Sequence, residues 1–206
     1  MKRREALKSI TLSSGAVLTS GSILSLLQSC TADENAWKPL YFSVEEGKIL
    51  RALCDVIMPK DEWPSASEVN VPQFIDLLYK DVYKSEDGDK IKKGLGLFDQ
   101  TFDDKYGDSF GEAETKDQIK GLRDYFEVSD DERSKLRKLV ENKTDDKNSD
   151  EYFIYSALTK VREMTISAYF QSEKIGEEFM PYLPVPTEWI GCMDVKEVGK
   201  VWSPNL

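Results

Sequence analysis

Between residues 43 and 170 the apolar residues recur mainly at intervals of three and four, which is the spacing of one face of an α-helix. Alternation with a period of two, which marks a half-buried strand, does not persist anywhere in the chain. The sequence therefore predicts an all-α protein, a single domain of about five or six helices. The predicted helices cover residues 43–58, 70–82, 91–106, 115–126, 129–140 and 151–170.

Several of these helices have recognisable ends. Ser43 with Glu46 forms a capping-box pattern, and Pro59 stops the first helix. The third helix follows a polar break at residues 85–89 and ends at Gly107. Further N-terminal signals are Asn70 with Pro72, Thr115 with Gln118, and Ser129 with Glu132.

The apolar stripe of each helix is expected to form the core. The clearest stripe consists of Ile91, Leu95, Phe98, Phe102 and Tyr106. The second helix contributes Phe74, Leu77, Leu78 and Val82, the fourth Ile119, Leu122 and Phe126, and the last Ile154, Ala157, Leu158 and Val161.

The C-terminal arm, residues 171–206, has a different pattern. Prolines at positions 181, 184 and 186 exclude both a helix and a central strand, while apolar and aromatic side chains continue. An irregular segment of this kind has to lay those side chains either on its own helical body or on a second protein. The candidate partner contacts near or in this arm are Phe179, Tyr182, Trp189 and Trp202.

Residues 1–30 have the pattern of an export signal. Arg3 and Arg4 are followed by Leu7 and Lys8, and a weakly apolar stretch diluted by Ser, Thr and Gly comes next. Paired arginines before a soft apolar region resemble a twin-arginine signal, which directs already folded cargo to export. A general secretory signal is the alternative. Residues 31–42 then form a polar tether to the helical domain, residues 43–206.

The leader ends in a lipobox-like sequence, Leu27-Gln28-Ser29-Cys30. Cleavage before Cys30 would leave a lipidated N-terminus that holds the protein at a membrane. Ordinary cleavage nearby and an uncleaved anchor remain alternatives. In each case we expect an exported protein on the periplasmic side of a bacterial envelope. The lipid at Cys30, or a signal that is not cleaved, would tether it to the membrane.

The net charge and the absence of histidine exclude several classes of function. The chain has 38 acidic and 28 basic residues and a net charge of −10, which disfavours nucleic acid as a partner. Without histidine, histidine-activated nucleophiles, histidine-ligated haem and most catalytic zinc sites are excluded. No dinucleotide, phosphate-loop or c-type haem motif occurs. We therefore expect no catalytic residue, metal site or cofactor site in this chain.

Two groups of carboxylates remain as candidates for acid–base or calcium chemistry. They are Asp99, Asp103, Asp104 and Asp108 in the first group, and Asp145, Asp146 and Asp150 in the second. Neither group has the order of a calcium-binding loop with its central glycine. We interpret both as solvated faces.

The cysteines allow two arrangements. If Cys30 is lipidated, Cys54 and Cys192 remain as a pair in an oxidising compartment. A disulfide between them would tie the first helix to the end of the arm. In the alternative, Cys54 is a small buried thiol, because it lies next to the apolar face of its helix.

Short motifs occur in a fixed order along the body and the arm. They are Asp55-Val56-Ile57-Met58-Pro59, Val71-Pro72-Gln73-Phe74-Ile75-Asp76, Gly94-Leu95, Phe98-Asp99, Gly107-Asp108-Ser109-Phe110, Pro181-Tyr182-Leu183-Pro184-Val185-Pro186 and Gly191-Cys192. Behind a twin-arginine leader, this set resembles the gluconate 2-dehydrogenase subunit 3 family. Two segments depart from the family pattern: the turn at residues 63–66 and the acidic region 130–150, which looks like an insertion.

The resemblance implies a small, cofactor-free subunit of a periplasmic sugar or sugar-acid dehydrogenase. FAD and hydride abstraction would reside in a large partner of the glucose–methanol–choline oxidoreductase type, and a cytochrome c subunit with haem c would take the electrons. In such complexes the leader of the small subunit can escort the folded flavoprotein through export.

Two other functions are alternatives to the role of a dehydrogenase subunit. One is a free-standing envelope lipoprotein that scaffolds other proteins or binds sugars, for which Trp63 beside Asp61 and Glu62 offers a stacking surface. The other is an autonomous enzyme that uses two carboxylates.

Overall fold

The computed structural model describes residues 37–141 and 149–181, and residues 192, 194, 196, 199 and 202 singly. The described residues from Lys38 onward belong to one unit. The described residues contain helices and no strand, so the predicted all-α single domain is confirmed. The elements are α3 (Val44–Ile57), η3 (Ser67–Val69), α4 (Val71–Asp81), α5 (Ser85–Tyr106), α6 (Thr115–Phe126), α7 (Asp130–Val140), α8 (Asp150–Phe170) and the π-helical turn η4 (Ile175–Phe179).

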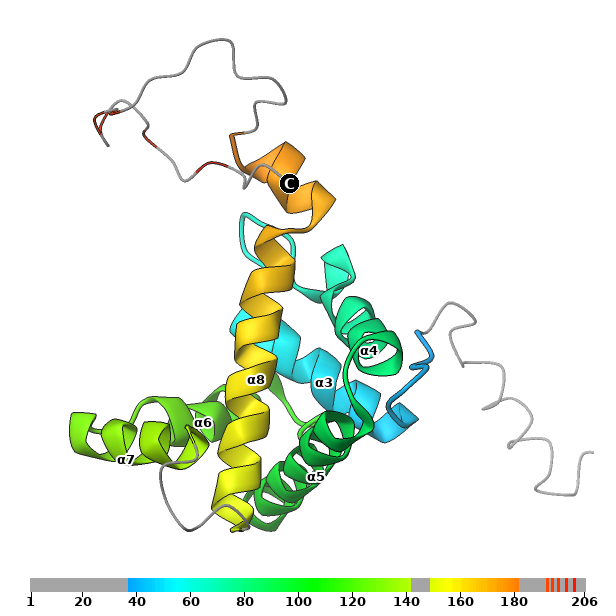
Figure 1. The fold of residues 1–206 in the computed structure, drawn as a ribbon, viewed down its shortest axis with the longest axis vertical. Coiled ribbons are helices and arrows are strands. Elements are labelled where there is room, and N and C mark those ends of the chain that lie inside the picture. Colours follow the sequence, from blue (N-terminus) through cyan, green and yellow to red (C-terminus); the bar gives the residue numbers. More distant parts are fainter. Residues whose placement is uncertain are drawn as a thin grey trace, which may run out of the picture. The chain divides into compact units, whose positions relative to one another are not determined.

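Helix α8 is the central element of the body (Figure 1). It contacts α3, α4, α5 and α7, and α6 packs on α3. Four helices thus bury side chains against α8, and α6 adds to the same core through α3. The fully buried apolar side chains include Leu50, Leu53, Ile75, Leu95, Phe98, Phe110, Leu158 and Val161.

Several predicted helix ends are confirmed. The Ser43 hydroxyl accepts a hydrogen bond from the Glu46 N–H at 3.1 Å, and the Glu46 carboxylate accepts one from the Ser43 N–H at 2.8 Å. Ser129 caps α7 in the same way through its hydroxyl. Gly107 closes α5 with φ of +81°, a conformation that glycine adopts without a steric penalty.

Three details of the predicted ends are wrong. The polar residues 85–89 are not a break but the first turn of α5, where Glu86 and Asp87 interact favourably with the helix dipole. Asn70 does precede α4, but its side chain makes no capping hydrogen bond. Gln118 does not cap α6 either, because its side-chain amide donates to the Phe110 carbonyl oxygen at 2.7 Å.

The core face of α4 also differs from the prediction. Phe74, Leu77 and Val82 are 49%, 43% and 69% exposed, whereas Val71, Ile75 and Tyr79 are buried. The sequence of this helix carries two apolar faces, and both satisfy helical spacing. The inward face is fixed by Tyr79, whose ring stacks on Tyr41 and Tyr83 and meets Phe42 edge-on, and by the fully buried Asp76.

Three aspartates hold loops against the helices. The buried carboxylate of Asp76 accepts hydrogen bonds from the backbone N–H groups of residues 40, 41 and 42 at 2.7–3.1 Å. Asp55 accepts from the N–H and the hydroxyl of Ser67. Asp99 accepts from the Ser109 hydroxyl and the Phe110 N–H, so this residue is a loop anchor rather than part of a solvated face.

Candidate functional site

The arm begins as part of the helical body. Ile175 is fully buried in η4, and Met180 just after it is also buried. The Tyr169 hydroxyl at the end of α8 donates a hydrogen bond to the carbonyl oxygen of Pro64 at 2.7 Å. These contacts fix the start of the arm against the loop that follows α3.

An aromatic cluster marks the same place. The ring of Trp63 lies 5.6 Å from the ring of Phe179 and 6.5 Å from that of Phe170, measured between centroids. Phe179, one of the predicted partner contacts, is half-buried and therefore packs at least in part on its own domain. The same contacts cover part of Trp63, the residue that the sugar-binding alternative needs as an open stacking surface.

Of the remaining predicted partner contacts, the structure describes Trp202 alone. Trp202 is 45% exposed. Tyr182, Trp189 and Cys30 lie outside the described residues, as do Arg3, Arg4, Leu7 and Lys8 of the predicted signal. Their predicted roles stay predictions.

The disulfide between Cys54 and Cys192 is not formed in this structure. Both cysteines are free, the first buried and the second exposed. The Cys54 sulfur lies 3.3 Å from the Thr165 hydroxyl oxygen, and burial raises the pKa of this thiol to about 12. Cys54 is therefore the small buried thiol of the alternative arrangement, because α3 and α8 enclose it.

Helix α4 presents an exposed apolar surface that the sequence analysis assigned to the core. We call Phe74 and Leu77 the α4 apolar face, since Val82 lies beyond the last residue of the helix. Phe74 and Leu77 lie three residues apart, so they share one side of the helix. Exposed large apolar side chains that cluster on one element are typical of a surface that binds a protein. The spacing alone could not reveal this, because it also fits a buried stripe.

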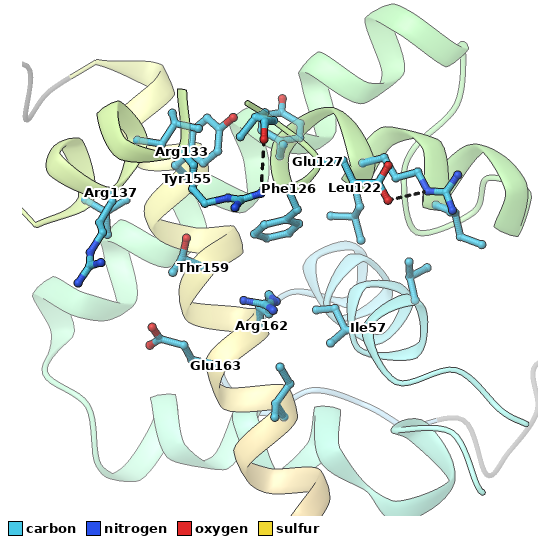
Figure 2. Close-up of a pocket in the computed structure, with 18 of the residues that line it drawn as sticks. Ile57, Leu122, Phe126, Glu127, Arg133, Arg137, Tyr155, Thr159, Arg162 and Glu163 are labelled. Atoms are coloured by element: carbon cyan, nitrogen blue, oxygen red, sulfur yellow. Dashed lines mark hydrogen bonds and ion pairs between the residues drawn. The ribbon is translucent and has the colours of Figure 1, made fainter. Parts of the chain in front are cut away.

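A cleft lies between α3, α6, α7 and α8. This cleft has a volume of about 1020 Å³ (Figure 2). Its apolar lining includes Val56 and Ile57 of α3, Ile119, Leu122 and Phe126 of α6, and Leu136 and Val140 of α7. Sequence reasoning missed the cleft, because each of these residues has the pattern of ordinary core.

The cleft also contains arginines, which stand out in an acidic chain. Arg123 pairs with Glu127 at 3.3 Å, Arg133 with Asp130 at 3.1 Å and Arg137 with Glu141 at 2.8 Å. Arg162 of α8 instead places its guanidinium carbon 5.6 Å from the centroid of the Phe126 ring.

The described residues offer neither a metal-binding cluster nor a membrane-spanning helix. Across residues 37–141 and 149–181 and the singly described positions, no cluster of three or more acidic or cysteine side chains could hold a metal ion. Over the same part of the chain, no helix has the length and apolar character that a membrane span requires.

The described part of the chain is thus a small all-helical domain with an apolar outer face on α4 and a largely apolar cleft that also contains arginines and glutamates. The profile of the family described as gluconate 2-dehydrogenase subunit 3 matches residues 44–187, which is more than half of the chain. The chain belongs to this family, as the ordered motifs of its sequence suggested. No curated protein and no solved structure matches it.

Proposed function

We propose that this protein is the non-catalytic small subunit of a dehydrogenase complex whose large subunit contains FAD and oxidises a sugar or sugar acid. The observation that carries the proposal is the family match over residues 44–187, since the family is named as a subunit of a dehydrogenase. In this division of labour, the large subunit of the glucose–methanol–choline type abstracts hydride, and the helical subunit contributes binding surface. A cytochrome c subunit accepts the electrons.

The large subunit binds the α4 apolar face in this proposal. Phe74 and Leu77 are large apolar side chains that are 49% and 43% exposed, and a partner would cover them. Rigid aromatic anchors such as Phe74 often dominate the affinity of an interface. Tyr182, Trp189 and Trp202 of the arm serve as further anchors.

Export is the second part of the proposed role. The twin-arginine pattern at Arg3 and Arg4, with Leu7 and Lys8, supports transport of a folded cargo. A leaderless flavoprotein bound to this subunit would cross the membrane with its FAD already in place. Lipidation at Cys30 would then keep the complex on the periplasmic face of the membrane.

Co-expression of the tagged full-length chain with a large FAD-binding protein of the glucose–methanol–choline type from the same genome tests the proposal. We expect the two proteins to co-purify, with flavin absorbance in the complex. The double substitution Phe74→Glu with Leu77→Glu should reduce the recovered flavoprotein at least tenfold, because two buried apolar contacts become charges in the interface.

Val44→Glu is the matched control, since Val44 is 56% exposed but lies on α3. It should leave co-purification unchanged. Unchanged recovery with the double variant would reject the α4 apolar face as the interface. Absence of the flavoprotein from the wild-type preparation would reject the subunit role itself.

A further inference from the structure

The cleft between α3, α6, α7 and α8 is larger than the gaps that normal packing leaves. Protein interiors are close-packed, with few voids larger than a water molecule. A volume of about 1020 Å³ is at the upper end of the range of small-molecule sites. Ile119 is 38% exposed, and Leu136 and Val140 are only half-buried, although all three have the spacing of core residues. An apolar occupant would complete their burial.

Helix α7 has few other contacts that hold it in place. Leu139 is its one buried residue, and the remaining apolar side chains of the helix line the cleft. Packing of apolar faces supplies most of the stability of a short helix. The cleft wall formed by α7 is therefore an incomplete interface, and a ligand with a hydrocarbon chain would supply the missing contacts.

The charged side chains at the cleft indicate where the charged end of such a ligand would bind. Three of the four arginines already have carboxylate partners at exposed positions. Among the described residues, Arg162 has no carboxylate within ion-pair distance, and its guanidinium lies beneath the ring of Phe126 (Figure 2). The neighbouring Glu163 points away from that guanidinium in the same view. Arg162 is therefore available to a carboxylate or phosphate, which guanidinium binds through two parallel hydrogen bonds.

We propose that this cleft binds an anionic amphiphile with a single acyl chain, the head group at Arg162 and the chain along the apolar lining formed by α3, α6 and α7. A free fatty acid and an anionic lysophospholipid share this chemistry. The site is separate from the α4 apolar face, so it does not depend on the subunit role proposed above.

Equilibrium dialysis of the full-length chain against radiolabelled dodecanoate, kept below its micelle concentration, tests the proposal. We expect saturable binding of about one dodecanoate per chain, and binding of 1-dodecanol at least tenfold weaker, because the alcohol lacks the charge. Arg162→Gln should weaken dodecanoate about tenfold and leave 1-dodecanol unchanged. Arg51→Gln, an exposed arginine outside the cleft lining, is the charge-matched control and should change neither.

Filling the cleft gives an independent test. Thr159→Trp places a large ring in the lining and should reduce binding of both probes. Competition by lysophosphatidylglycerol at lower concentration than unlabelled dodecanoate would identify a lipid as the source, and weaker competition would identify a free fatty acid. Three results would each overturn the proposal. They are a lack of saturable binding, equal affinity for dodecanoate and 1-dodecanol, and an equal effect of the two arginine substitutions.

Discussion

The hydroxyl of Tyr169 donates a hydrogen bond to the carbonyl oxygen of Pro64 across 2.7 Å, joining two residues that are 105 positions apart in the chain. The bond is buried and connects the end of α8 to the loop after α3. Trp63, the neighbour of Pro64, contacts both Phe170 and Phe179. The hydrogen bond between Tyr169 and Pro64 therefore helps to position the aromatic cluster at the start of the C-terminal arm.

Replacing Tyr169 by Phe should lower the free energy of unfolding by about 1–2 kcal/mol, because a buried carbonyl oxygen loses its donor. Urea denaturation measures this change. Tyr83→Phe is the control: it removes a hydroxyl but keeps the ring stack with Tyr79 at 4.7 Å, and should cost less than about 0.5 kcal/mol. Equal losses in the two variants would mean that the bond to Pro64 contributes nothing specific.

Two glycines of α5 should respond to alanine with opposite signs. A methyl group on Gly94 would lie 2.3 Å from the Phe153 carbonyl oxygen, so α5 and α8 would have to separate. We expect Gly94→Ala to destabilise the fold by roughly 1–3 kcal/mol. Gly96 has open space and is exposed, so Gly96→Ala should stabilise the helix by about 1 kcal/mol. Thermal melting of both variants checks the prediction, which fails if the signs agree.

Asp76 uses both carboxylate oxygens, and asparagine cannot replace them. In the native protein, Asp76 Oδ2 accepts a hydrogen bond from the N–H of Leu40 at 2.7 Å. In Asp76→Asn the side-chain NH₂ group would face this N–H, and two donors cannot bond to each other. We expect a loss of about 3 kcal/mol, measured by denaturant unfolding. Asp55→Asn should cost only about 1 kcal/mol, because its partner Ser67 Oγ can reverse its hydrogen bond and accept from the amide. A milder effect at Asp76 than at Asp55 would contradict the anchoring role.

Because the thiol of Cys54 is buried, the free energy of unfolding should decrease at alkaline pH. Its pKa is raised to about 12 because burial disfavours the thiolate, whereas a thiol in the unfolded chain ionises near about 8.5. Between these values the unfolded state binds fewer protons than the folded state, so stability decreases as pH rises, by about 1.4 kcal/mol per pH unit. Below about 8.5 the contribution is fully present.

Urea unfolding under reducing conditions, from about pH 8 to about pH 11, measures this slope. Cys54→Ala should show a shallower decrease than the wild type, while Cys192→Ala should follow the wild type, because Cys192 is exposed. Parallel curves for all three proteins would show that burial does not raise the pKa of the Cys54 thiol.

The sequence was sufficient wherever local chemistry alone decides the structure. The stripe from Ile91 to Phe102 is buried, and Gly107 ends its helix in the left-handed conformation. Ser43 and Ser129 cap their helices as their spacing to Glu46 and Glu132 predicts. In each case the partners lie within a few residues of each other.

Tertiary contacts decided the remaining features. The pattern of α4 fits two opposite faces, and the buried one is selected by hydrogen bonds from residues 40–42 to Asp76, some 35 positions away. The cleft combines residues of four helices, among them Ile57, Ile119 and Arg162, which no sequence window contains together. Periodicity identifies apolar positions but not whether a neighbour covers them.

Purification of the tagged full-length chain from its native cells tests the central claim most directly, with flavin content and sugar dehydrogenase activity measured before and after the chain is separated from its partners. We predict a complex with a large FAD-containing protein that holds all of the activity, and an isolated chain that is colourless and inactive. A chain that purifies alone and oxidises a sugar or sugar acid by itself would contradict the account.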